Sequence, residues 1–192
     1  GMGLDKRIGG RFLRAGPAYG GSCFPKDTRA ITNTADRYNT NLSVIKSVIK
    51  SNQNRSSLLL KRVIEILNGK VKNKKVCFLG VTFKANTDDM RDSSCLSMIP
   101  SLIKKGSQVN YFEPTGEKNE FKRIKNVTFS KDINSAIRDS DLIIIHTEWN
   151  EFKSIDFKRI VKNKKFKIFD MRNIYSSNKM KDLKIKYYAV GS

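Results

Sequence analysis

The sequence predicts an α/β protein, in which an N-terminal helical part is followed by a doubly wound, mostly parallel Rossmann-like sheet. Apolar residues recur at helical spacing between positions 43 and 67 of the 192-residue chain. Beyond a charged stretch at 70–75, short apolar runs alternate with helical patterns, as they do in βαβ units. Most of these runs are continuous rather than alternating, which is typical of parallel strands that are buried on both faces.

The helical part is expected over residues 1–72. Residues 1–27 are rich in glycine and lack periodicity, so they are predicted to form loops and short turns. A first helix is predicted to begin at Asp27 or Thr28, either of which can cap it. A break at 39–41 separates this helix from a longer one over residues 43–67, which Asn68 and Gly69 end.

The sheet part is expected over residues 73–192. The run at 75–81 predicts a buried strand, and the run DLIIIH at 141–146 is the clearest strand signal in the chain. Further strands are predicted at 108–112, 127–129, 166–169 and 187–190, and helices at 133–137, at 156–161 and from Ser93 to Gly106. Ligands of such open parallel sheets bind beyond the carboxyl ends of the strands.

The formal net charge of +20 and the isoelectric point near 10.0 indicate an anionic partner. Lysines are scattered along the chain and no arginine-rich arm occurs, so a phosphate-bearing small molecule is favoured over nucleic acid. The longest apolar runs, such as 142–145, are far too short to cross a bilayer, so no membrane contact is expected.

The three cysteines form no Cys-x-x-Cys pair, and no secretory signal is visible, which predicts free thiols and a cytoplasmic location. Cys77 and Cys95 are expected to be small buried side chains in a strand and a helix. The single histidine, His146, argues against a multi-histidine site, and no metal is expected.

The run from Tyr19 to Thr28, YGGSCFPKDT, is the most informative motif of the chain. Two glycines allow the backbone to approach another group closely, and Cys23 follows them after one serine. A thiol beside a fixed cation such as Lys26 favours a reactive thiolate, so Cys23 is the candidate nucleophile. Asp27 is either a general base or only the cap of the following helix.

The turn after the predicted strand at 75–81 lacks the glycines of a dinucleotide-binding fingerprint. A G-x-G-x-x-G turn brings backbone N–H groups to a pyrophosphate, whereas this turn reads GVTFKAN and has one glycine. Lys84 stands in the turn instead. The sequence therefore predicts a phosphate or sugar site that is served by side chains.

Four ordered segments resemble the UDP-glucose/GDP-mannose dehydrogenase family. They are RIGGRFLRAGPAYGGSCFPKD (7–27), VTFKANTDDMRDSS (81–94), HTEW (146–149) and FDMRN (169–173). A lone GGSC would be a weak signal, but the ordered set spans most of the chain. The resemblance implies that residues 1–72 are the central helical dimerisation domain with the catalytic loop, and that residues 73–192 are the nucleotide-sugar (UDP) binding domain.

The resemblance also implies a reaction, the oxidation of a sugar C6 alcohol to a carboxylate with two NAD⁺. Cys23 is implied to attack the intermediate aldehyde, giving a thiohemiacetal that is oxidised to a thioester. Asp27 is implied to activate the water that hydrolyses this thioester. Lys26 and Arg91 are implied to contact the NAD cofactor, Arg91 at its pyrophosphate.

The substrate contacts that the resemblance implies come from three parts of the chain. They are Arg7, Phe12, Leu13, Arg14, Tyr19, Gly20, Gly21, Ser22, Phe83, Lys84 and Arg172. Arg7 is implied to reach the substrate of the partner subunit, which makes a homodimer part of the prediction. Two residues depart from the family pattern, because His146 stands where a small residue is common and Ala18 where glycine is common.

The serine before Cys23 and the FPKDT after it fit the UDP-glucose branch of the family, whose members are UDP-glucose 6-dehydrogenases. The chain is therefore expected to be the C-terminal part of such an enzyme. Because no segment resembles the family's N-terminal NAD-binding domain, the chain by itself is expected to be inactive. A GDP-mannose 6-dehydrogenase fragment and a non-catalytic nucleotide-sugar-binding module remain the alternatives.

Overall fold

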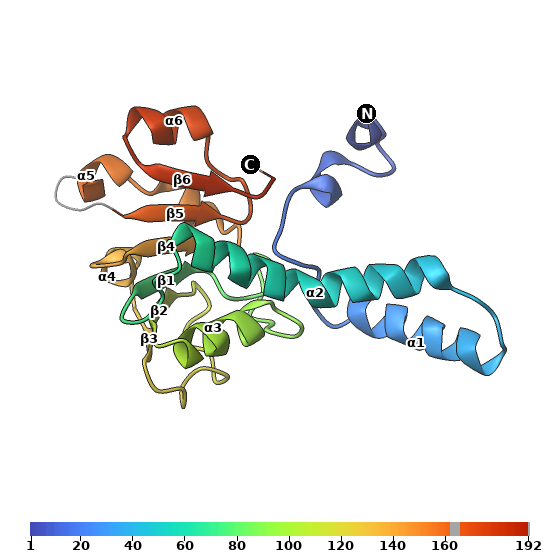
Figure 1. The fold of residues 1–192 in the computed structure, drawn as a ribbon. Helices are drawn as coiled ribbons and strands as arrows, with labels where there is room; N and C mark the ends of the chain where they lie inside the picture. Colours follow the sequence, from blue (N-terminus) through green and yellow to red (C-terminus); the bar gives the residue numbers. More distant parts are fainter. Residues whose placement is uncertain (162–165, 192) are drawn as a thin grey trace.

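The structure is a computed structural model that describes residues 1–161 and 166–191, except for the side chains at positions 11, 12 and 161. A helical hairpin, α1 (Phe24–Arg37) and α2 (Ser43–Ile66), projects from one side of a six-stranded sheet (Figure 1). Two short 3-10 helices, η1 (Met2–Leu4) and η2 (Gly10–Leu13), precede the hairpin. The predicted α/β class, with helices first and a sheet after them, is confirmed.

The strands of the sheet are β1 (Lys75–Leu79), β2 (Gln108–Phe112), β3 (Val127–Phe129), β4 (Leu142–Ile145), β5 (Lys167–Asp170) and β6 (Lys186–Ala189). They follow the order β3-β2-β1-β4-β5-β6, and every neighbouring pair is parallel. The order reverses between β1 and β4. In open parallel sheets, the carboxyl ends of the strands at such a reversal are where ligands bind.

Helices cover both faces of the sheet, which makes it doubly wound. The second half of α2 and α3 (Cys95–Lys104) pack on one face. On the other face lie α4 (Ile133–Ile137), η3 (Asn150–Ser154), α5 (Phe157–Val161) and α6 (Ser177–Asp182). Strand β1 alternates between the two cores, since Val76 and Phe78 enter the first and Cys77 and Leu79 the second. Full burial of a Val, Leu or Phe side chain contributes roughly 1.5–3 kcal/mol.

Helix α2 belongs to both the hairpin and the sheet. Leu59, Val63 and Ile66 recur at helical spacing and are buried in the first core. Near its beginning, Val44 and Val48 are exposed. The ammonium of Lys167 in β5 donates to the carbonyl oxygen of Ile66, where a cation interacts favourably with the negative end of the helix. One long helix therefore fixes the hairpin relative to the sheet.

Three local predictions differ from the structure. Helix α1 begins at Phe24 rather than at Asp27 or Thr28, because Pro25 falls in the first turn, where proline is favourable. Asp27 therefore lies inside the first turn and is not the helix cap. Helix α3 begins at Cys95 after Ser94, not at Ser93.

Helix α6 and the 3-10 helices η1, η2 and η3 are absent from the sequence prediction, because these segments lack a repeating apolar pattern. Only Met180 is buried in α6, and no residue of η1 is buried.

Within the described residues, no helix is both long enough and apolar enough to span a membrane.

Candidate active site

The segment that carries Cys23 lies against the loop that follows β1. We call residues 16–23 the thiol loop and residues 80–94 the β1 loop. The backbone N–H of Gly21 donates to the carbonyl oxygen of Arg91 at 2.8 Å. A Cβ atom at Gly20 would lie 2.8 Å from the carbonyl oxygen of Asp92, so a side chain there would collide with the β1 loop. The glycines of the motif thus permit main-chain contact between the two loops.

The other side of the thiol loop is held by two polar side chains of α2. The Asn52 amide accepts from Tyr19 N and donates to Tyr19 O, both at 3.0 Å. The Arg55 guanidinium donates to the carbonyl oxygens of Pro17 at 3.1 Å and Gly16 at 3.3 Å. Four backbone groups of the loop are therefore bonded to one helix, which fixes the path of the chain toward Cys23.

Cys23 is the N-cap residue of α1, and its side chain is exposed. The hydroxyl oxygen of Ser22 lies 3.5 Å from its sulfur. The positive end of the helix dipole is the environment in which reactive thiolates are found. Cys77 and Cys95 are fully buried, and burial raises the pKa of both thiols. Cys23 is thus the accessible thiol among the three.

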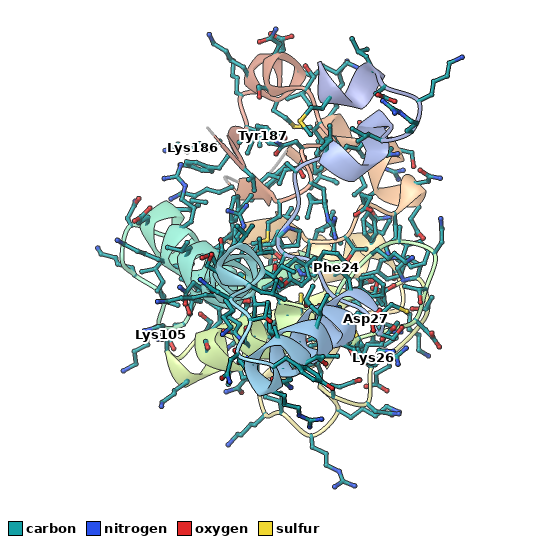
Figure 2. All side chains as sticks on the ribbon, turned by 90° about the vertical axis from the view of Figure 1, so that its right-hand side faces the viewer. Phe24, Lys26, Asp27, Lys105, Lys186 and Tyr187 are labelled. Atoms are coloured by element: carbon teal, nitrogen blue, oxygen red, sulfur yellow. The ribbon has the colours of Figure 1, made fainter. Side chains whose placement is uncertain are left out.

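Phe24, Lys26 and Asp27 follow Cys23 in the first turn of α1, where Figure 2 shows them close together. The Lys26 ammonium lies 3.3 Å from Oδ1 of Asp27, and both side chains are largely exposed. The ring of Phe24 packs edge-on against Tyr19, with 4.8 Å between centroids. An exposed ion pair of this kind adds little stability. Both charged groups are accessible in the first turn of the helix that Cys23 caps.

Arg91 brings a guanidinium from the β1 loop to the same place. Asp89 holds it through Nε at 3.0 Å and Nη2 at 2.9 Å. These hydrogen bonds raise the pKa of Arg91, the charge of Asp89 raises it further, and a negative charge at Cys23 adds to the effect. A thiolate at Cys23 would therefore lie within electrostatic range of Arg91, and the guanidinium is exposed to an incoming anion.

A second arginine, Arg172, lies at the carboxyl ends of the strands and is mostly buried. Its Nε donates to the carbonyl oxygen of His146 at 2.9 Å, and its Nη2 donates to that of Phe83 at 2.8 Å. Burial lowers the pKa of Arg172, and the carboxylate of Glu148, 2.9 Å away, raises it. Arg172 thus connects the loops that follow β1 and β4.

Arg172 also touches the thiol loop, because a Cβ atom at Gly16 would lie 2.9 Å from its Nη1. Next to Phe83, the Lys84 ammonium lies 5.3 Å from the centre of the Phe83 ring. The structure therefore brings the thiol loop against Phe83, Arg91 and Arg172 of the sheet part, and Lys84 lies beside Phe83.

The remaining predicted site residues precede the thiol loop. Arg7 is exposed and pairs with Asp5 at 2.6 Å, while Leu13 and Arg14 are also exposed. The side chain of Phe12 lies outside the described residues. Figure 1 shows this N-terminal segment extending away from both α1 and the sheet. These residues are not gathered with the thiol in the single chain.

Sequence reasoning missed Asn52, Arg55 and Asp89. The sequence carries one signal for Asn52 and Arg55. Positions 52, 55, 59, 63 and 66 form one stripe of α2, and its last three members are buried apolar residues. Polar side chains in the core-facing stripe of a helix indicate specific hydrogen-bond partners.

In the described part of the chain, no group of three or more His, Cys, Asp or Glu side chains is placed to hold a metal ion.

Two models of one protein family match the chain. The model described as "UDP-glucose/GDP-mannose dehydrogenase family, UDP binding domain" matches residues 77–177. The model described as the central domain of the same family matches residues 1–54. The two matched ranges are the helical part that holds the thiol loop and most of the sheet part.

Comparisons with individual proteins also match UDP-glucose dehydrogenases. The chain is 41% identical to a UDP-glucose 6-dehydrogenase of Rickettsia felis over 195 residues, and 39% identical to one of Rhizobium meliloti over 192 residues. Each match covers 100% of this chain but 44% of the relative, so the chain spans less than half the length of these curated relatives. A solved UDP-glucose dehydrogenase from Pyrobaculum islandicum superimposes with a TM-score of 0.82 at 27% identity, covering 98% of this chain and 41% of that one.

Proposed function

The chain belongs to the UDP-glucose/GDP-mannose dehydrogenase family, and from this premise we propose that it provides the nucleotide-sugar site and the nucleophilic cysteine of a UDP-glucose 6-dehydrogenase. The observation that carries the proposal is the position of Cys23. Its exposed thiol lies in a loop that contacts Phe83, Arg91 and Arg172 at the carboxyl ends of the strands. Residues 1–72 would act as the central domain and residues 73–192 as the UDP-binding domain.

The reaction we propose is the two-step oxidation of UDP-glucose to UDP-glucuronate. The Cys23 thiolate adds to the C6 aldehyde and gives a thiohemiacetal, whose oxidation leaves a thioester on the sulfur. Asp27 accepts a proton from the water that cleaves this thioester, releasing the carboxylate and the thiol. Ser22 and the backbone of Gly20 and Gly21 would surround the sugar.

NAD⁺ is the cofactor that this proposal requires, and when bound it accepts the hydride of each oxidation. The exposed guanidinium of Arg91 suits a pyrophosphate, because a guanidinium forms paired hydrogen bonds with phosphate oxygens. The exposed ammonium of Lys26 lies one helical turn beyond Cys23 and would face the cofactor near the reacting carbon. These two residues are the cofactor contacts of the proposal.

The substrate contacts proposed for the sheet part are Phe83, Lys84 and Arg172. Lys84 supplies a cation for the diphosphate, in a turn that lacks the fingerprint glycines. Arg172 is largely engaged by backbone carbonyls, so we assign it to shaping the pocket as well as to contacting the ligand. Tyr19 would line the pocket from the thiol loop.

The remaining substrate contacts require a second copy of the chain. In a homodimer built on the exposed apolar residues of α1 and α2, such as Ile31, Val44 and Val48, Arg7 would reach the substrate bound by the partner. Phe12, Leu13 and Arg14 would accompany it. Light scattering after size exclusion should give twice the monomer mass of 21.9 kDa, and a monomer at all concentrations would oppose this assembly.

The substrate assignment is tested by thermal unfolding with UDP-glucose, GDP-mannose and UDP-N-acetylmannosamine in parallel. A ligand that binds only the folded chain raises the unfolding midpoint. We expect the largest rise with UDP-glucose. A larger rise with GDP-mannose would assign the chain to the other branch, and no rise with any of the three would contradict the proposal.

The chain contains no G-x-G-x-x-G segment, so we expect binding of nucleotide sugar without turnover. Purified chain with UDP-glucose and NAD⁺ should produce no NADH, as followed by absorbance. Production of NADH by the purified chain would show that the residues present suffice for hydride transfer.

A further inference from the structure

Glu113 is a buried carboxylate that directly follows β2 and is only 1% exposed. Its Oε2 accepts from the backbone N–H groups of Val81 at 2.8 Å and Thr82 at 3.3 Å. Its Oε1 accepts from the hydroxyl of Thr115 at 3.1 Å. A buried carboxylate is costly unless hydrogen bonds replace its water, and these donors supply that replacement.

The two N–H groups that donate to Glu113 belong to the turn that follows β1 and Gly80. Gly80 has a φ of +77°. In dinucleotide-binding sheets, the N–H groups of this turn and the helix that follows it bind the pyrophosphate, and an acidic residue near the end of β2 binds a ribose. In this chain, the carboxylate of the acidic residue after β2 instead accepts from the N–H groups of this turn.

The helix that would complete a pyrophosphate site is also displaced. Helix α3 begins only at Cys95, and the β1 loop separates it from β1. Ser93 fixes this loop by donating its hydroxyl to the carbonyl oxygen of Val81 at 2.6 Å. The hydroxyl of Thr147 fixes it again by donating to the carbonyl oxygen of Thr82 at 2.7 Å.

Phe83 comes directly after the two residues that Glu113 holds. A Cβ atom at Gly21 would lie 2.6 Å from the ring of Phe83, so the ring is in close contact with the thiol loop. The carbonyl oxygen of Phe83 accepts from Arg172. A shift of Val81 and Thr82 would therefore be transmitted to Phe83, to Arg172 and to the loop that carries Cys23.

We propose that Glu113 is a positioning residue that acts as an internal anion. Its carboxylate occupies the phosphate cradle of the Rossmann-like turn and so holds Phe83 and Lys84 toward the thiol loop. The same contact engages the N–H groups of Val81 and Thr82, which are then not available to a dinucleotide. The effect on nucleotide-sugar binding rests on the proposed function, whereas the internal anion itself does not.

The test is chemical rescue of Glu113→Ala. The substitution removes the carboxylate and leaves two buried N–H groups without an acceptor, together with a space that acetate can fill. We expect the affinity for UDP-glucose, measured by calorimetry, to fall about tenfold or more. Sodium acetate should restore most of it, and sodium chloride at the same concentration should not.

The matched control is Ile143→Ala, which removes a buried side chain from the second core and touches none of these groups. It should lower stability without an acetate effect on UDP-glucose affinity. Unchanged affinity of Glu113→Ala, or equal effects of acetate and chloride, would overturn the proposal.

The unfolding midpoint separates this proposal from the proposed function. If the unaltered chain binds no nucleotide sugar, the proposed function fails. The internal anion would still be supported if acetate raised the unfolding midpoint of Glu113→Ala, but not of Ile143→Ala, beyond the chloride effect. Equal midpoints in the two salts would reject it whatever the ligand result.

Discussion

The ring of Phe83 occupies the space that a side chain at Gly21 would need. Gly21 has a φ of +88°, and a Cβ atom built there would lie 2.6 Å from Cζ of Phe83. The glycine therefore meets two requirements at once, a left-handed backbone and direct contact with the sheet part. Since Cys23 lies two residues later, this contact sets the distance between the thiol and the β1 loop.

Gly21→Ala should be strongly destabilising. The left-handed conformation costs a residue with a Cβ about 1–2 kcal/mol, and the collision with Phe83 adds roughly 1–3 kcal/mol. Urea unfolding gives the total loss of unfolding free energy. The alkylation rate of Cys23 by iodoacetamide should also change, because the thiol loop must move to admit the methyl group.

Gly116→Ala is the matched control for this substitution. Gly116 has the same φ of +88°, but no atom lies within 4 Å of the site of its Cβ. Gly116→Ala should therefore lose only the unfolding free energy that the left-handed backbone costs, about 1–2 kcal/mol. The alkylation rate of Cys23 should stay unchanged. Equal losses in the two variants would mean that the contact between Gly21 and Phe83 is not restrictive.

Alkylation should also distinguish the three cysteines. In the folded chain, iodoacetamide should modify Cys23 alone, because Cys77 and Cys95 are fully buried and burial raises the pKa of both thiols. Peptide mass spectrometry identifies the modified site. All three should react in denaturant, and rapid labelling of Cys95 without denaturant would contradict the burial.

The proposed role of Cys23 requires a complete enzyme as its test. In such an enzyme, Cys23→Ser should abolish overall oxidation to UDP-glucuronate, because the thioester can no longer form. Product analysis by mass spectrometry measures the carboxylate directly. Carboxylate formation near the unaltered rate would assign the nucleophile to another group.

Much of the fold follows from sequence because its signals are local. The apolar runs that form β1 and β4 predicted the strands, and the spacing of Leu59, Val63 and Ile66 predicted α2. The contacts of Asn52 and Glu113 depend on residues about thirty positions away in the chain. No local pattern specifies such partners, so the geometry that holds the thiol loop needed the structure.

Asn52 offers a direct test of that geometry. Asn52→Ala removes both hydrogen bonds to the Tyr19 backbone and should cost roughly 1–3 kcal/mol, because two partly buried groups lose their partner. Asn52→Asp keeps an acceptor for Tyr19 N but places a carboxylate beside Tyr19 O, so it should be no better. Unfolding in urea measures the cost, and the alkylation rate of Cys23 measures displacement of the loop.

Asn54→Ala is the control, since Asn54 is exposed on the same helix. It should change the unfolding free energy by less than about 0.5 kcal/mol and leave the alkylation rate as it is. If Asn52→Ala and Asn54→Ala behave alike, the thiol loop is held without the amide.

The environment of His146 predicts a pH dependence of stability. The imidazole is fully buried, between the hydroxyls of Ser94 at 2.7 Å and Thr147 at 3.1 Å. The Thr147 hydroxyl donates to the carbonyl oxygen of Thr82, so it accepts from Nδ1–H, and Nε2 accepts from Ser94. Burial, with a smaller contribution from the charge of Arg172, lowers the pKa of His146 to about 3.

The two pKa values of His146, unfolded and folded, determine whether the unfolding free energy rises or falls with pH. Between the ordinary pKa near 6.5 and the folded value of about 3, the unfolded chain binds a proton at this histidine and the folded chain does not. The unfolding free energy should therefore fall as the pH drops below about 6.5, by about 1.4 kcal/mol per pH unit from His146 alone. Urea unfolding between pH 4.5 and 6.5, roughly the range above the ordinary carboxyl pKa values, isolates this contribution. His146→Gln should flatten the slope by about one proton, and an unchanged slope would show that another group takes up the proton.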